Sequence, residues 1–147
     1  RPSHFQGVCK VLSSLFDLVN PSVAIFGEKD YQQFLVVEQF VEQTDRFDKL
    51  HIACAPIIRE EDGVAMSSRN AYLSNDERRC AASLHKAIRC SSEEEMRAVI
   101  EDAGLTIEYA VIRDAQTLLE PEEHKPKRAL VVARAGNTRL LDNGVAS

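Results

Sequence analysis

Long hydrophobic runs are missing from this sequence of 147 residues, whose apolar stretches are only a few residues long. A helix that spans a bilayer needs about 20 apolar residues, so no membrane segment is expected, and no signal peptide is visible. Positive charge is not in excess, because 18 Lys and Arg stand against 23 Asp and Glu, for a net charge of -5. This balance argues against a nucleic-acid partner bound by bulk phosphate neutralisation, although a local cluster of cations can still bind a small phosphate ligand.

Metal-ligand spacings and several common nucleotide or hydrolase motifs are also absent. The cysteines form no CxxC pair and the histidines are scattered, so the sequence predicts no zinc or other metal site and favours a reduced, cytoplasmic setting. It contains no GxxxxGK[ST], GxGxxG or GxSxG. A P-loop kinase, a dinucleotide dehydrogenase and an α/β-hydrolase are therefore unsupported.

The first third of the chain has the pattern of a parallel α/β fold. Apolar spacings of three and four residues predict helices over residues 3–19 and 31–43, and two short apolar runs predict strands over 22–27 and 50–56. The strand over 22–27 is expected to be buried on both faces. Strand, helix and strand form a βαβ unit, and two strands cannot close a core. We therefore expect part of a Rossmann-like, doubly wound sheet over residues 1–57.

The remainder, residues 58–147, is expected to form a small α+β domain. A capping box that starts at Ser74 predicts a helix to about Arg89, and Ser91 or Ser92 begins a second helix that Gly104 ends. Strands are predicted over 106–113, 128–135 and 138–143, with residues 136–137 as a hairpin turn.

Polar residues follow the first predicted strand, where a doubly wound sheet binds its ligands. The run Gly27-Glu28-Lys29-Asp30 lies at the start of the next helix, whose backbone amides favour anions. Lys29 adds a positive charge there. The alternative is an ordinary polar loop with a surface lysine.

A second candidate is the stretch DGVAMSSRN, residues 62–70. Ser67, Ser68 and Arg69 offer two hydroxyls and a guanidinium, which suit phosphate oxygens, and Gly63 permits a tight bend. The alternative is a solvated loop in which a serine caps a helix, but Ser74 already caps the downstream helix.

Other polar groups are expected to be structural. The run Glu60-Glu61-Asp62 is interpreted as a solvated face, because adjacent carboxylates point in different directions. Arg139 and Asp142-Asn143 are expected to form a pair that closes the last hairpin.

Four blocks together resemble one enzyme family. RPSHFQGV, FGEKDYQQ, REEDGVAMSSRNAYLS and TRLLDN resemble, in order and spacing, the pantothenate synthetases (pantoate–β-alanine ligases). The resemblance covers residues 1–143. That family is similar to class I aminoacyl-tRNA synthetases and other nucleotidyltransferases, and it carries an HxGH-type signature that this sequence lacks. Because the chain also begins with Arg rather than Met, we expect a fragment, the carboxyl-terminal half of such an enzyme.

The resemblance implies an ATP-dependent condensation in the presence of Mg²⁺. Pantoate's carboxylate attacks the α-phosphate of ATP and releases pyrophosphate, and the amine of β-alanine then attacks the pantoyl adenylate and releases AMP. The complete enzymes of the family are expected to be cytoplasmic homodimers.

The resemblance also assigns roles to single residues. Gly27 lets the nucleotide come close to the protein backbone, Lys29 neutralises phosphate charge, and Asp30 binds the ribose hydroxyls. Gln33 binds pantoate. Ile58 meets adenine through its main chain. Met66, Ser67, Ser68 and Arg69 correspond to a KMSKS-like loop that closes over the triphosphate. Arg1 and His4 match blocks near the pantoate pocket.

Two other hypotheses remain open from the sequence. Another ATP- or CTP-using nucleotidyltransferase shares the fold and the loop, although Gln33 argues against it. A catalytically inactive fragment that serves as an interaction module is the other. Without the HxGH-type half, we expect the chain alone to form no adenylate, and its exposed sheet edge predicts self-association.

Overall fold

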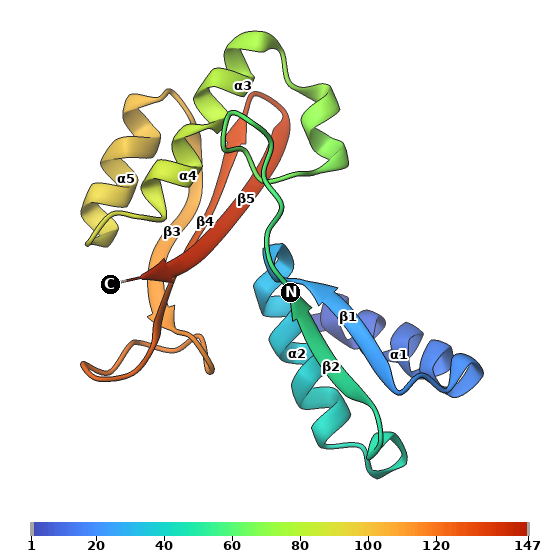
Figure 1. The fold of residues 1–147 in the computed structure, drawn as a ribbon. Helices are drawn as coiled ribbons and strands as arrows, with labels where there is room; N and C mark the ends of the chain where they lie inside the picture. Colours follow the sequence, from blue (N-terminus) through green and yellow to red (C-terminus); the bar gives the residue numbers. More distant parts are fainter. Residues whose placement is uncertain (1, 147) are drawn as a thin grey trace. The chain divides into compact units, whose positions relative to one another are not determined.

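The computed structural model describes residues 2–146, with side chains from residue 4 onward. The chain divides into two compact units, Arg1–Pro56 and Ile57–Ser147, each of which is described by itself. The first contains a parallel sheet and the second an antiparallel sheet (Figure 1). The expected order of a parallel α/β part followed by an α+β part is therefore confirmed. Among the described residues, no helix is long and apolar enough to cross a membrane.

The first unit is a β-α-β segment preceded by a helix. Helix α1 (Pro2–Val19) leads into strand β1 (Val23–Gly27), and helix α2 (Tyr31–Glu42) connects β1 to strand β2 (His51–Ala55). Short 3-10 turns stand on either side of α2, η1 (Glu28–Asp30) before it and η2 (Asp45–Phe47) after it. The strands are parallel, in a register that pairs Val23 with His51 and Gly27 with Ala55. Their carboxyl ends therefore lie at the same edge of the sheet.

The two helices of this unit cover one face of its sheet. Phe16 from α1, Val37 and Val41 from α2, and Ile52 from β2 share one buried apolar cluster, against which Phe26 packs. The helices reach this cluster because their apolar residues recur every three to four positions.

The opposite face of β1 carries exposed apolar side chains. Val23 is 50% exposed and Ile25 is 71% exposed. The prediction that this strand is buried on both faces is therefore wrong. Successive side chains of a strand point to opposite faces, and within the first unit α1 and α2 cover only the face of Ala24 and Phe26.

The second unit packs helices against a three-stranded sheet. Its helices are α3 (Asn75–Ala81), α4 (Ser83–Ala87) and α5 (Glu93–Asp102), after a 3-10 turn, η3 (Ser68–Tyr72). Its strands are β3 (Thr106–Asp114), β4 (Lys127–Ala135) and β5 (Thr138–Ala146), in the order β3-β4-β5 with antiparallel pairing. Figure 1 shows the helices together on one side of this sheet.

The capping signals in the sequence identify the helix starts of this unit. Ser74 and Glu77 form the predicted capping box of α3, and Ser92 caps α5 by accepting a hydrogen bond from the Glu95 amide. The single helix predicted to run to about Arg89 is wrong, because it is interrupted at Ala82. That residue keeps right-handed helical angles, φ -61° and ψ -20°, so the interruption is local.

The core of the second unit includes a residue of the candidate loop. Met96 and Ile100 of α5 pack with Ala110 and Val131 of the sheet, and Val64 belongs to the same buried cluster. The hairpin turn at residues 136–137 is also confirmed, with Gly136 at φ 54°. The segment around Val64 is therefore attached to the folded core of its own unit.

Helix α5 also protects the open edge of β3. The Glu93 carboxylate accepts a hydrogen bond from the Ile112 amide at 2.8 Å, and Arg97 donates one to the Ala110 carbonyl at 3.2 Å. Because these backbone groups lie on an edge strand, side-chain bonds of this kind hinder pairing with a further strand.

Candidate functional site

In the first unit, the polar candidates follow the carboxyl end of β1. Gly27 is the last residue of β1, Lys29 lies in η1, and Gln33 is in the first turn of α2. Asp30 is the residue before α2 and is exposed, whereas Lys29 and Gln33 are half-buried. The structure thus brings together Gly27, Lys29, Asp30 and Gln33 in the segment that joins β1 to the first turn of α2.

The backbone at Gly27 can be approached closely. A Cβ atom added to Gly27 would have no heavy atom within 4 Å, apart from its own chain neighbours. The residue has φ -72° and ψ 132°, angles that any amino acid adopts, so backbone strain does not require a glycine. What glycine provides at this position is open space beside the main chain, next to the first amides of η1 and α2.

His4 lies near the start of α1. Its side chain is exposed, and its ring centroid lies 5.3 Å from that of Phe5 in an edge-on arrangement. The chain joins α1 to β1 through residues 20–22, and Phe16 and Phe26 share one cluster. The start of α1 therefore lies toward the carboxyl end of β1. Arg1, the other residue expected near the pantoate pocket, lies outside the described residues.

In the second unit, the candidate loop begins with a small hairpin. Arg59 and Ala65 form an isolated antiparallel bridge, and the Met66 amide donates to the Ile58 carbonyl at 2.9 Å. The turn is closed at Gly63, whose φ of 87° is a conformation that favours glycine. The predicted tight bend at Gly63 is confirmed.

The hairpin presents the next residues to solvent. Met66 is 55% exposed, and the side chains of Ser68 and Arg69 are exposed. Ser67 accepts a hydrogen bond from the Arg69 amide at 3.2 Å and so caps η3. The capping alternative considered for these serines is thus realised by Ser67, while Ser68 and Arg69 point a hydroxyl and a guanidinium outward.

Asn70 fixes the end of this exposed segment. It is only 7% exposed, and its Nδ2 donates to the Glu60 carboxylate at 2.6 Å and to the Ala65 carbonyl at 3.1 Å. Its Oδ1 is buried and, among the described residues, has no hydrogen-bond partner. The two donations fix the orientation of the amide, because only the nitrogen can donate.

The acidic run before the loop is an ion-pair network. Arg78 of α3 donates to Glu60 and to Asp62, each at 2.6 Å. Hydrogen bonds from Asn70 and Arg78 lower the pKa of Glu60, and the hydrogen bond from Arg78 lowers the pKa of Asp62. Glu60 is half-buried, so the interpretation of this run as a solvated face is wrong for Glu60, whereas Asp62 stays exposed although it pairs with Arg78.

Arg59 forms an ion pair with Asp142 of strand β5. Its two terminal nitrogens donate to the two oxygens of Asp142, at 2.7 and 2.9 Å, and Asp142 is only 3% exposed. Arg139 instead donates to Glu108 at 2.8 Å. The predicted pairing of Arg139 with Asp142 and Asn143 is thus wrong. Alternation along β5 puts Arg139 and Asp142 on opposite faces, and Asn143 accepts a hydrogen bond from Arg128.

Sequence reasoning missed Arg59, Asn70 and Asp142 as parts of the loop structure. One signal was available: in the predicted last strand, Asp142 shares a face with Leu140, which packs into the core. A carboxylate on a buried strand face requires a cation or several donors. Nothing in the sequence identifies Arg59 as that cation, because the two residues are 83 positions apart.

The candidates form two groups, one in each unit. Gly27, Lys29, Asp30 and Gln33 belong to the first, and residues 58–70 belong to the second. Each group offers donors to an anion: backbone amides with Lys29 in the first, and hydroxyls with Arg69 in the second.

Comparisons with known proteins identify the family of this arrangement. The family model described as pantoate-beta-alanine ligase matches residues 1–145. The chain belongs to the pantoate–β-alanine ligase family. A pantothenate synthetase of Xylella fastidiosa (strain 9a5c) is 44% identical over 157 aligned positions, which cover 97% of this chain and 55% of that protein. One of Bradyrhizobium sp. (strain BTAi1) has the same identity and coverage.

Solved structures of the ligase family have the same fold. Pantothenate synthetase from Thermus thermophilus matches with a TM-score of 0.85 and 39% identity, over 98% of this chain and 56% of that chain. Pantoate-beta-alanine ligase from Francisella tularensis, complexed with beta-gamma ATP and beta-alanine, matches with a TM-score of 0.77 and 28% identity, over 99% of this chain and 51% of that one. The chain spans about half the length of the curated relatives it matches.

Proposed function

We propose that the complete protein containing this chain condenses pantoate with β-alanine at the expense of ATP. The family match over residues 1–145 carries this proposal, and the two groups of candidate donors support it. The pantoate carboxylate oxygen attacks the α-phosphorus, and the bond to pyrophosphate breaks. The β-alanine nitrogen then attacks the acyl carbon, loses a proton, and AMP leaves.

The residues of the first unit are suited to the nucleotide and to pantoate. Gly27 leaves its backbone accessible to ATP, and the exposed carboxylate of Asp30 can accept hydrogen bonds from ribose hydroxyls. Lys29 offsets the repulsion between the pantoate carboxylate and the α-phosphate. Gln33, in the first turn of α2, donates and accepts hydrogen bonds to pantoate. His4 and Arg1 stay proposals for the same pocket, and the position of His4 at the start of α1 suits that role.

The residues of the second unit are suited to the triphosphate and adenine. Ser67, Ser68 and Arg69 supply donors for phosphate oxygens, with Met66 at the start of the segment. Ile58 accepts a hydrogen bond from Met66 through its carbonyl and is 62% exposed, and the proposal assigns it a main-chain contact with adenine. In this proposal the first unit is part of the nucleotide-binding domain and the second is a lid.

Magnesium would reach this site with ATP. Within the described residues there is no group of three or more His, Cys, Asp or Glu side chains that could hold a metal ion. Mg²⁺ is commonly held by substrate phosphates and one or two carboxylates, so these residues fit an ion bound mainly by ATP, and no step is assigned to it. A cytoplasmic homodimer remains part of the proposal.

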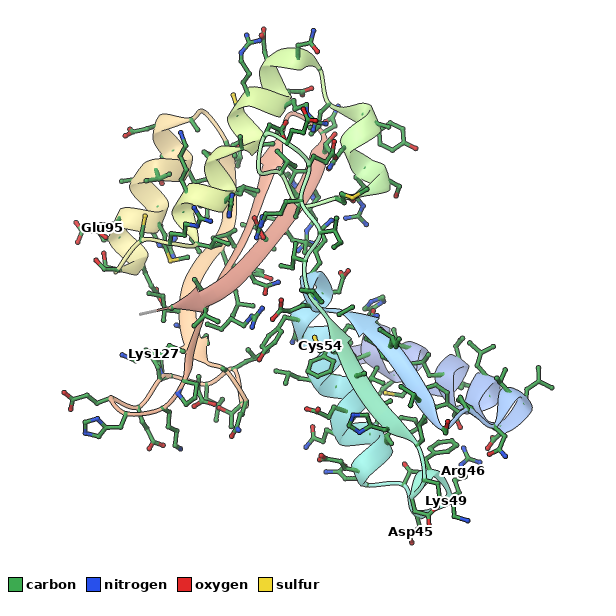
Figure 2. All side chains as sticks on the ribbon, in the orientation of Figure 1. Asp45, Arg46, Lys49, Cys54, Glu95 and Lys127 are labelled. Carbon is green, nitrogen blue, oxygen red and sulfur yellow. The ribbon has the colours of Figure 1, made fainter. Side chains whose placement is uncertain are left out.

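Replacing Lys29 tests the proposal. Removal of one preorganised donor to developing charge typically costs about 10²–10³ in rate, so Lys29→Ala in the complete protein should lower pantoate-dependent pyrophosphate–ATP exchange by at least that factor. Lys49→Ala is the matched control, because Lys49 is an exposed lysine of the same unit before the amino end of β2 (Figure 2). Exchange in Lys29→Ala close to that of Lys49→Ala would overturn the assignment.

The inactive-fragment alternative is tested with this chain alone. AMP release is measured with ATP, pantoate and β-alanine at saturating concentration. We expect none above background, because the sequence lacks the HxGH-type signature of the family. Turnover comparable to that of the complete protein would show that these residues suffice.

A further inference from the structure

We propose that Asp142 is a positioning residue that acts through Arg59 to hold the Met66–Arg69 segment in the conformation that binds the triphosphate. The inference rests on the proposed function, because it assigns the segment to ATP. Its structural basis is independent of that function: a buried ion pair ties the hairpin under the segment to the sheet of the second unit.

The ion pair is bidentate and largely out of solvent. The guanidinium of Arg59 donates to both oxygens of Asp142, and the side chain of Arg59 is 20% exposed. The Asn143 amide also donates to Asp142 at 2.8 Å. A paired carboxylate and guanidinium with two parallel hydrogen bonds fix each other's orientation as well as their distance.

Arg59 carries this constraint into the hairpin. Nη1, one of the two terminal nitrogens that bind Asp142, also donates to the Gly63 carbonyl at 3.1 Å. Gly63 lies at the turn of the hairpin. The backbone of Arg59 bridges to Ala65, the residue directly before Met66. A displacement of Arg59 therefore moves the turn and the start of the exposed segment together.

The other end of the segment has its own anchor. Asn70 holds the Ala65 carbonyl and Glu60, and Arg78 holds Glu60 from α3. Residues 66–69 are thus an exposed stretch between two fixed points. Donors held in place before a ligand arrives bind it more strongly, because less conformational freedom is lost on binding.

A contribution to overall stability does not by itself explain the ion pair between Arg59 and Asp142. A buried ion pair often contributes little net stability compared with apolar residues of similar size. A role in positioning therefore predicts a local effect, one that a purely structural role would not produce: the segment should loosen, and the KM for ATP should rise more than kcat falls.

The test is Asp142→Asn in the complete protein, with amide hydrogen exchange and steady-state kinetics as readouts. The amide keeps the size of the side chain but weakens the charged, bidentate contact, and hydrogen bonds to charged groups are among the stronger ones. We expect amides of residues 63–70 to exchange about tenfold faster or more, with those of α5 unchanged. The KM for ATP should rise about tenfold with kcat within twofold.

Glu108→Gln is the matched control. It makes the same carboxylate-to-amide change in the same sheet, at a carboxylate that binds Arg134 and Arg139, away from the hairpin contacts. It should leave both the exchange of residues 63–70 and the KM for ATP unchanged. If Asp142→Asn does not fold, Asp142→Glu, which keeps the charge and lengthens the side chain, takes its place with the same two readouts.

The possible outcomes separate this inference from the proposed function. Unchanged exchange in residues 63–70, or faster exchange spread equally over the whole second unit, overturns the positioning role. Arg69→Ala serves as the third variant. If residues 63–70 loosen in Asp142→Asn but Arg69→Ala leaves the KM for ATP unchanged, the positioning stands and the assignment of the segment to ATP fails. If the positioning role and the assignment of the segment to ATP are both correct, adding Asp142→Asn to Arg69→Ala should raise the KM for ATP little further. The two substitutions would then act on one set of contacts.

Discussion

Replacing Asn70 with aspartate should destabilise the second unit by about 3–5 kcal/mol at neutral pH. The change converts a buried amide donor into a carboxylate of the same shape. The Ala65 carbonyl would lose its donor, which costs about 1–3 kcal/mol for a buried acceptor. The introduced charge would also lie against the Glu60 carboxylate, now 2.6 Å from the amide nitrogen, and the two negative charges would repel each other.

The defect should also depend on pH in a characteristic direction. Two carboxyl groups this close cannot both ionise easily, so the pKa of the pair rises in the folded state. A pKa raised above its unfolded value means that stability is highest when the group is protonated. The loss caused by Asn70→Asp should therefore shrink as the pH falls from 7 to about 5 and grow as the pH rises through the raised pKa.

The assay is urea unfolding followed by circular dichroism, at pH 7 and pH 5. Asn75→Asp is the matched control, since Asn75 is exposed at the start of α3, where a negative charge is favourable. We expect the control to change the unfolding free energy by no more than about 0.5 kcal/mol. An Asn70→Asp variant as stable as this control at pH 7, or one whose loss is the same at both pH values, would refute the hydrogen-bond orientation deduced for Asn70.

Two further predictions concern acid sensitivity and association. The pKa values of Glu60 and Asp62 are lowered by their hydrogen bonds, so their contribution to stability is complete above the ordinary values of 4.5 and 3.8 and is lost as the pH falls through the lowered folded values. The protection factors of the amides of residues 60–66, which compare each exchange rate with the intrinsic rate at the same pH, should therefore fall in acid, and Arg78→Ala should remove most of that pH dependence. The 147-residue chain alone should self-associate through the uncovered face of β1, and Ile25→Lys should shift it toward monomer in sedimentation velocity; a wild-type chain that stays monomeric at high micromolar concentration contradicts this.

Local signals predicted most of the elements correctly. The capping box at Ser74 and the Gly136 turn are decided by interactions between neighbours in the chain, and sequence spacing reports such interactions directly. The burial of the first strand could not be predicted in this way. An apolar run such as that around Ile25 indicates that a strand can be buried on both faces, but the elements that cover those faces come from elsewhere in the chain.

The candidate site likewise has features that local sequence predicts and features that depend on distant contacts. The exposed donors Ser68 and Arg69 and the bend at Gly63 can be proposed from one short stretch of sequence. The partners that hold this stretch, Arg59 with Asp142, depend on a contact between distant positions. Charge pattern alone therefore assigned the carboxylate of Asp142 to its neighbour Arg139, whereas strand alternation directs the two side chains to opposite faces.

The architecture around the loop separates two requirements that the segment must meet if it binds phosphate as proposed. Its donors have to be accessible, which excludes burying them, and they have to be preorganised, which a free surface loop does not provide. Here the hydroxyl of Ser68 and the guanidinium of Arg69 stay exposed. The side chains that hold the segment in place, chiefly Asn70 and Asp142, are buried. If the segment binds ATP as proposed, substitutions at these two buried positions should alter ATP affinity without removing any of the proposed ATP-contacting groups, and that separation distinguishes positioning from direct binding.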